Sequence, residues 1–408
     1  MSNMPMRYVV MYLFFTLAAY LVSYGADLSV RVVFYVTACF VVLAFGAHGR
    51  LALRLRDPVS SVTTRRIQAL VTASVVAVVL ISLVNIATFY SDWSSVTKYL
   101  LDPSAAYEYV KLRRRNEDFN SVGLSSFAGV LLTSLSFSRY MLVGFAIMFW
   151  NRLSRQIRLL VLFALVVYLG QCFLIGAMVN IGSLLASAFP FFLYRVRSRA
   201  GVPSGGSRLF MLIVLGAGLA TMMYFVGSRG EFGGNADFGE TIRSGAKGLL
   251  FYVSHGYEGL AHCLDLPFEP TGGRTLFYGF STTLSTDSSW FAHSYLGRSE
   301  EAFGWSALQV WSTAFPWIAS DLTFWSVPVL MLFVGVLSKK LWSEGVRFDN
   351  PFALLALGQI MIFAAYIPAN NQLFHTFGNS VGVLAIFIMY TVSVRKGRTI
   401  VLREGSRR

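Results

Sequence analysis

The sequence predicts an all-α fold, a polytopic bundle of about ten transmembrane helices, and three observations predict it. Hydrophobic residues make up 55% of the chain and the mean hydropathy is +0.59, while only 13% of the residues are charged, about half the share in a soluble domain. Most apolar residues fall in runs long enough for a helix to cross a hydrocarbon core of about 30 Å. Arg and Lys residues lie between these runs, so the net charge of +14 indicates membrane topology and no nucleic-acid partner.

The expected spans are apolar runs that end at charged or turn residues. They cover residues 7–24, 30–48, 67–90, 123–150, 158–176, 178–194, 209–227, 322–338, 352–368 and 378–394. We expect the first run to be a retained span, because no small-residue cleavage site follows it. We also expect residues 1–408 to form a single integral membrane domain.

Residues 305–319 have an apolar length intermediate between a span and an interfacial helix. A span here would move the basic C-terminal tail to the outside. The positive-inside rule therefore favours a helix that lies in the interface.

The distribution of basic residues predicts that the N and C termini are both cytoplasmic. With this orientation most of the 34 Lys and Arg residues fall on inside segments, and most of the 20 acidic residues fall outside. Two long outside loops result, residues 91–122 and 228–321. The second loop lies between the seventh and eighth spans, and loops of this length tend to be functional.

Cations near the outer face are the candidate binding residues, because orientation rules disfavour them there. Arg229 ends the seventh span between glycines, and Arg274 follows two glycines that allow a ligand to approach the backbone closely. Arg243 lies in the same loop. A guanidinium group matches phosphate oxygens bidentately. Each of them could also be an Arg that snorkels from a helix end or a solvated loop side chain.

Three other residues are candidates because of their chemistry or position. His293 is the first candidate for a general base, although a lone histidine is usually a hydrogen-bonded structural residue. Asp321 is the second candidate for the base. Arg139 lies inside the fourth span, where an ionisable side chain is costly and usually faces the bundle interior or a cavity. Alternatively, this span breaks at residues 136–138 and leaves Arg139 at a re-entrant end. No metal-ligand spacing and no nucleotide motif is present, so we expect neither a metal nor a cofactor.

Several of these segments resemble motifs of the O-antigen polymerase (Wzy) and O-antigen ligase superfamily of bacterial envelope glycan enzymes. The similar segments are Gly227-Ser228-Arg229-Gly230, Gly273-Arg274, His293-Ser294-Tyr295-Leu296 with Glu301 and Gly304, and the run from Phe315 to Asp321. The last of these is similar to the polymerase branch. Together they cover less than a third of the chain.

The resemblance implies a glycosyltransferase of the bacterial inner membrane, with a site that faces the periplasm. It would transfer an undecaprenyl-diphosphate-linked oligosaccharide to an acceptor repeat unit, without a metal. Arg229 and Arg274 would stabilise the diphosphate leaving group, and His293 or Asp321 would accept the hydroxyl proton. Arg243 and Arg139 are further substrate-binding candidates.

The partners that follow are the lipid-linked oligosaccharide, the lipid bilayer and a chain-length regulator protein. The closest rival function is an O-antigen ligase that transfers glycan to the lipid A core. Two further candidate functions are a lipid-linked oligosaccharide transporter without chemistry and a structural assembly partner. A transporter often has inverted repeats, and the sequence shows no visible repeat.

Overall fold

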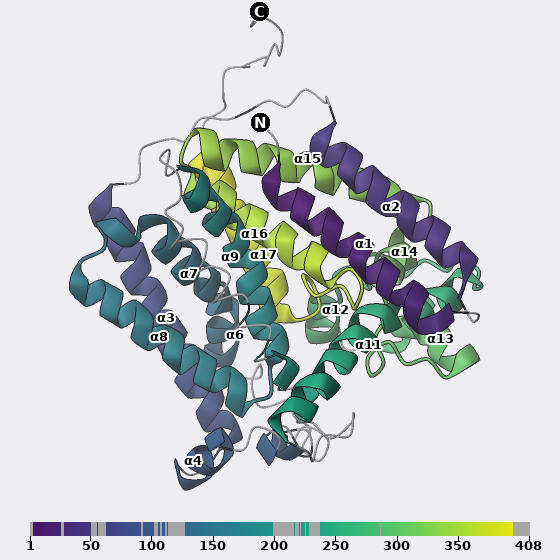
Figure 1. Cartoon of the computed structure of the whole chain (residues 1–408), viewed down its shortest axis with the longest axis horizontal. Helices are drawn as coiled ribbons and strands as arrows, with labels where there is room; N and C mark the ends of the chain where they lie inside the picture. Colours follow the sequence, from purple (N-terminus) through teal and green to yellow (C-terminus); the bar gives the residue numbers. More distant parts are fainter. Residues whose placement is uncertain are drawn as a thin grey trace, which may run out of the picture. The chain divides into compact units, whose positions relative to one another are not determined.

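A computed structural model describes most of the chain. The described residues are 3–25, 28–49, 55, 63–90, 93–101, 105–106, 108–110, 112, 127–198, 216, 220, 222–224, 226–227, 237–285 and 287–394. Every element in these ranges is a helix, as Figure 1 shows. Within the described ranges, seven helices are long and apolar enough to cross a membrane. The all-helical class that the sequence predicts is therefore confirmed, and the seven helices are consistent with a polytopic membrane protein.

Six of these seven helices are single elements, and one is a run of short helices. The single elements are α1 (Met4–Tyr24), α2 (Val30–His48), α3 (Thr64–Phe89), α8 (Arg155–Leu174), α9 (Met178–Ser198) and α15 (Ser326–Arg347). The run consists of α6 (Phe127–Ser134), η2 (Leu135–Phe137), α7 (Ser138–Phe149) and η3 (Trp150–Arg152). All seven coincide with expected spans to within a few residues at most ends, although α15 extends further than expected.

Two further apolar helices, α16 (Pro351–Tyr366) and α17 (Phe377–Ser393), match the last two expected spans but are shorter than the other seven. The expected span at 209–227 lies largely outside the described residues, as does most of the loop 91–122, of which α4 (Trp93–Leu101) is described. The count of ten spans and the sidedness of the termini stay predictions.

The chain divides into two compact units. The first unit comprises Met1–Thr63, Ala186–Tyr194 and Ser254–Arg408, and the second comprises Thr64–Leu185 and Arg195–Val253. Two helices, α9 and α11 (Phe238–Leu264), contribute residues to both.

In the first unit, α2 and α15 pack closely because glycines face each other across the contact. A Cβ atom added at Gly46 would overlap the Leu332 carbonyl oxygen, and one added at Gly335 would overlap the Leu43 carbonyl oxygen. Small residues allow membrane helices to approach in this way, which increases van der Waals contact between their backbones. The glycine pair therefore fixes the α2–α15 contact.

The helix α16 lies at the centre of the first unit. Thirteen of its sixteen residues, from Pro351 to Ala364, are buried. Its N-terminus is well defined, because the Asn350 side chain accepts hydrogen bonds from the Phe352 and Ala353 amides and proline occupies the first helical position. By contrast, α1 and α2 expose large apolar side chains such as Met11 (67%) and Phe34 (74%), as expected for helices that face lipid.

Between α11 and α15 the first unit has short elements. They are α12 (Tyr278–Leu284), η4 (Ser289–Phe291), α13 (Tyr295–Phe303) and α14 (Ala314–Leu322). The structure differs here from the expected interfacial helix at 305–319. Residues 305–313 are not helical, and α14 has nine residues, of which all but the last two are buried. A helix of this length is far too short to cross a bilayer.

The second unit is built around α3, which packs against α7 and α8. At the C-terminal end of α3, three tyrosine rings form a cluster in which Tyr109 stacks on both Tyr90 and Tyr99. The Tyr90 hydroxyl donates a hydrogen bond to the Leu174 carbonyl at 2.7 Å, which joins the ends of α3 and α8.

Candidate functional site

The loop that carries Arg274 is held by a carboxylate. Asp321, in the last turn of α14, accepts hydrogen bonds from the Gly273 amide at 2.7 Å, from the Leu276 amide at 2.6 Å and from the Thr271 hydroxyl. Gly272 and Gly273 have φ angles of 66° and 83°, which favour glycine. Both Asp321 oxygens are engaged, so the geometry favours a positioning role for this carboxylate over the general-base role considered from the sequence.

A second segment, between α16 and α17, also holds this loop. The Asn371 amide donates to the Leu276 carbonyl at 2.8 Å, and the Gly279 amide donates to the Phe374 carbonyl at 2.8 Å. A Cβ atom at Gly279 would overlap the backbone of Thr376. The Arg274 loop is therefore fixed on two sides.

We expect Asp321→Asn to loosen the loop. The asparagine amide nitrogen would face a backbone donor, and hydrogen bonds to a charged group contribute about 1.5–3 kcal/mol. Amide hydrogen exchange at Gly273 and Leu276 should accelerate by about tenfold or more. Exchange mass spectrometry of peptides that cover the loop measures this. The exposed Glu301 provides a control, Glu301→Gln, and unchanged exchange in Asp321→Asn would contradict the positioning role.

Arg274 and His293 line one cleft in the first unit. The cleft has a volume of about 360 Å³, and its other walls are Pro270, Thr271, Gly272 and Trp290. The Arg274 side chain is 47% exposed and that of His293 is 65% exposed, so both can reach a ligand that enters from outside. Of the arginine candidates, the structure therefore brings Arg274 to the same cleft as His293.

A weak ion pair neutralises part of the Arg274 charge. The guanidinium lies 3.9 Å from the Asp287 carboxylate, and both side chains are about half exposed. Hydrogen bonds from Ser289 and the nearby guanidinium lower the pKa of Asp287, so this carboxylate is charged at neutral pH. Exposed pairs contribute about 0–1 kcal/mol, so an anionic ligand can displace Asp287 at little cost.

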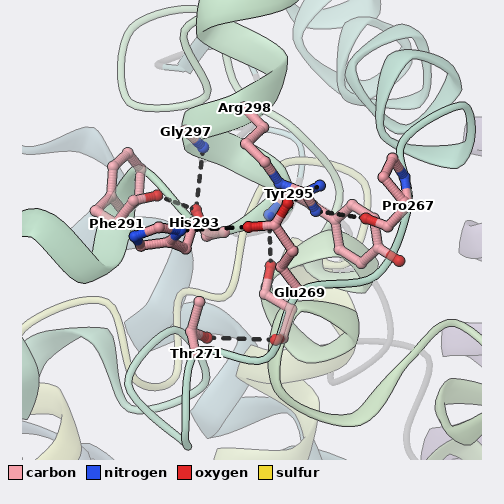
Figure 2. Close-up of polar contacts among 10 residues, drawn as sticks. Pro267, Glu269, Thr271, Phe291, His293, Tyr295, Gly297 and Arg298 are labelled. Carbon is pink, nitrogen blue, oxygen red and sulfur yellow. Dashed lines mark hydrogen bonds and ion pairs between the residues drawn. The ribbon is translucent and has the colours of Figure 1, made fainter.

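His293 has a carboxylate partner, which Figure 2 shows. Its Nδ1 atom lies 3.3 Å from Glu269 Oε2, and the other Glu269 oxygen accepts a hydrogen bond from Arg298 Nη1 at 3.1 Å. Arg298 also donates to the Pro267 carbonyl at 2.6 Å. A carboxylate on Nδ1 orients the imidazole and leaves Nε2 available to accept a proton. The His293–Glu269–Arg298 arrangement can therefore act as a general base.

The start of α13 fixes the backbone beside His293. The Ser294 hydroxyl accepts a hydrogen bond from the Gly297 amide at 3.0 Å, which caps the helix (Figure 2). The Tyr295 amide donates to the Ser320 hydroxyl at 3.0 Å. Because Ser320 precedes Asp321 on α14, the same short helix supports both walls of the cleft.

Two further arginine candidates, Arg139 and Arg243, do not line this cleft. Arg139 lies in the second unit, where it lines a different cavity. Arg243 also belongs to the second unit and is exposed on α11, while Thr241 and Gly245 pack against residues 223 and 227. Arg229 lies outside the described residues.

Glu269 and His375 are residues that the sequence analysis did not select. His375 is partly buried, and its ring stacks on Tyr278 at 5.3 Å and lies against Trp317 at 5.5 Å. Burial lowers the pKa of His375, so the imidazole is neutral at pH 7. The polar run at residues 370–372, between two apolar helices, is the sequence signal that could have identified this segment.

Comparisons with protein-family models, with curated proteins and with solved structures give no match. Within the described ranges, no three His, Cys, Asp or Glu side chains are grouped so that they could hold a metal ion.

Proposed function

We propose that this chain is a glycosyltransferase that polymerises undecaprenyl-diphosphate-linked oligosaccharide repeat units. Its substrates would be two lipid-linked units in the bacterial inner membrane, with the cleft on the periplasmic side. The observation that carries the proposal is that Arg274 and His293, from separate motifs, line one open cleft in an apolar, all-helical chain. A cation for a phosphate leaving group and a base for a hydroxyl are the two groups that this transfer needs.

In the proposed reaction an acceptor hydroxyl attacks the anomeric carbon of the donor glycan. A new glycosidic bond forms as the bond from that carbon to the diphosphate oxygen breaks. His293 takes the hydroxyl proton at Nε2, and Glu269 stabilises the imidazolium that results. Arg274 stabilises the negative charge on the departing undecaprenyl diphosphate.

The glycines before Arg274 and the support from Asp321 fit this role. A guanidinium that is already oriented loses less conformational entropy when it binds the diphosphate and stabilises the transition state more effectively. The backbone at Gly272 and Gly273 also lacks side chains that would keep a bulky ligand away.

A deletion strain tests the proposal. We expect loss of the gene to leave single repeat units on the lipid A core, because ligation proceeds without polymerisation. A ligase would instead leave polymer on the lipid carrier when deleted. A transporter would move labelled substrate across liposomes without forming a product. Unchanged polymer ladders in the deletion strain would reject the proposed function.

A further inference from the structure

The second unit contains a polar cavity within its helical bundle. Its volume is about 230 Å³, and it lies among α3, α7, α8 and the start of α9. A water molecule occupies about 30 Å³ in the liquid, so the cavity has room for more than one structural water. Its polar wall residues include Ser82, Asn85, Ser138, Arg139, Gln171 and Asn180.

Three of these side chains have polar atoms without a hydrogen-bond partner among the described residues. They are the hydroxyl oxygens of Ser82 and Ser138 and the Oε1 atom of Gln171. These residues are only 1%, 6% and 3% exposed. Buried polar groups normally find partners, so three such atoms around one cavity indicate a polar ligand.

Arg139 supplies the positive charge of the cavity. Its Nη2 atom donates to the Tyr140 hydroxyl at 2.9 Å, and its guanidinium carbon lies 4.8 Å from the Tyr140 ring centre and 6.0 Å from that of Tyr168. The 3-10 turn η2 directly precedes Ser138, and such turns within a helix often mark functional positions. The helix continues through this turn, so a re-entrant end at Arg139 is not seen.

The position of the cavity and its apolar walls favour an amphiphilic ligand. Ser82 and Asn85 lie in the last two turns of α3, Gln171 lies in the last turn of α8, and Asn180 lies in the first turn of α9. These helix ends lie together at one end of the unit. The remaining walls include Val78, Ile81, Phe89 and Ile175.

We propose that this cavity binds the phosphate ester of a membrane lipid. Arg139 and the serine hydroxyls would donate hydrogen bonds to the phosphate oxygens, and Gln171 Oε1 would accept one from a hydroxyl of the headgroup. The acyl or isoprenoid chain would follow the apolar walls. This site is separate from the cleft of the first unit, and the inference does not depend on the proposed function.

Lipid retention in nanodiscs tests this inference. The protein is reconstituted with equal amounts of phosphatidylglycerol and of diacylglycerol with the same acyl chains, and retained lipid is measured by native mass spectrometry. We expect the wild type to retain phosphatidylglycerol selectively. Retention should fall about tenfold or more in Arg139→Gln, because charge-assisted hydrogen bonds are the strongest in such a site. In a second arm undecaprenyl phosphate replaces phosphatidylglycerol, which identifies the source of the phosphate.

The Ser82→Ala, Ser138→Ala double variant keeps Arg139, so it tests the cavity even if Arg139→Gln does not fold. It should also lose selective retention, while a substitution of an exposed arginine of the same unit, Arg65→Gln, should not. Equal retention in wild type and both cavity variants would overturn the inference. The inference would also be overturned if inorganic phosphate stabilised the protein against unfolding while neither phospholipid was retained. The polymer ladder of the deletion strain tests the proposed function, and lipid retention by the Arg139 and serine variants tests this inference, so failure of one is distinguishable from failure of the other.

Discussion

Arg274→Ala is expected to lower the rate of glycan transfer by about 10²–10³-fold, the usual cost of removing one group that stabilises a developing anion. The structure gives the reason. Arg274 lines the cleft beside His293, its loop is fixed by Asp321, and its Asp287 partner is displaced at little cost. Among the described residues, no other arginine lines this cleft.

The measurement is kcat and KM of purified variants with a lipid-diphosphate-linked oligosaccharide. Arg274→Lys should recover part of the activity, because lysine keeps the charge but cannot bind a phosphate bidentately. Arg31→Ala is the matched control. Arg31 is exposed, forms an ion pair with Asp265 at 2.6 Å and does not line the cleft. Wild-type turnover by Arg274→Ala would contradict the role given to this residue.

Apolar runs predict most of the helices because length and hydropathy alone decide whether a helix can span a bilayer. This holds for α1, α2 and α8, whose ends agree with expectation within a few residues. It fails for the segment 305–319, where the apolar residues of α14 are buried against neighbouring elements rather than against lipid. A hydropathy profile cannot distinguish these two kinds of burial.

The candidate site was predictable only in part. Arg274 and His293 could be selected because charge and residue type stand out in an apolar chain. Glu269, 24 residues before His293, could not be selected, because its contact arises from the tertiary fold. The fold likewise gives Asp321 its partners, since the amides it binds lie more than 40 residues earlier in the chain. Arg139 was correctly expected to face a bundle interior or cavity, and the structure assigns it to the second unit.

His293 and Glu269 form the second large expected effect, because a positioned general base contributes about 10²–10⁴-fold to the rate. If the proposed function is correct, we expect His293→Gln to lower the rate of glycan transfer by this factor. Glutamine fits a similar space and can keep a hydrogen bond to Glu269, but it cannot accept a proton at neutral pH.

Glu269 acts through His293, so its substitution should show non-additivity. Glu269→Gln should lower kcat by itself, but the Glu269→Gln, His293→Gln double variant should be hardly slower than His293→Gln alone, because residues that act as a unit do not lose activity independently. His262→Gln is the control for a histidine of the same unit that does not line the cleft. If the losses multiply in the double variant, Glu269 supports the fold through Arg298 and does not act by orienting the imidazole. The reason is that Glu269→Gln weakens the Glu269–Arg298 ion pair whether or not His293 is present.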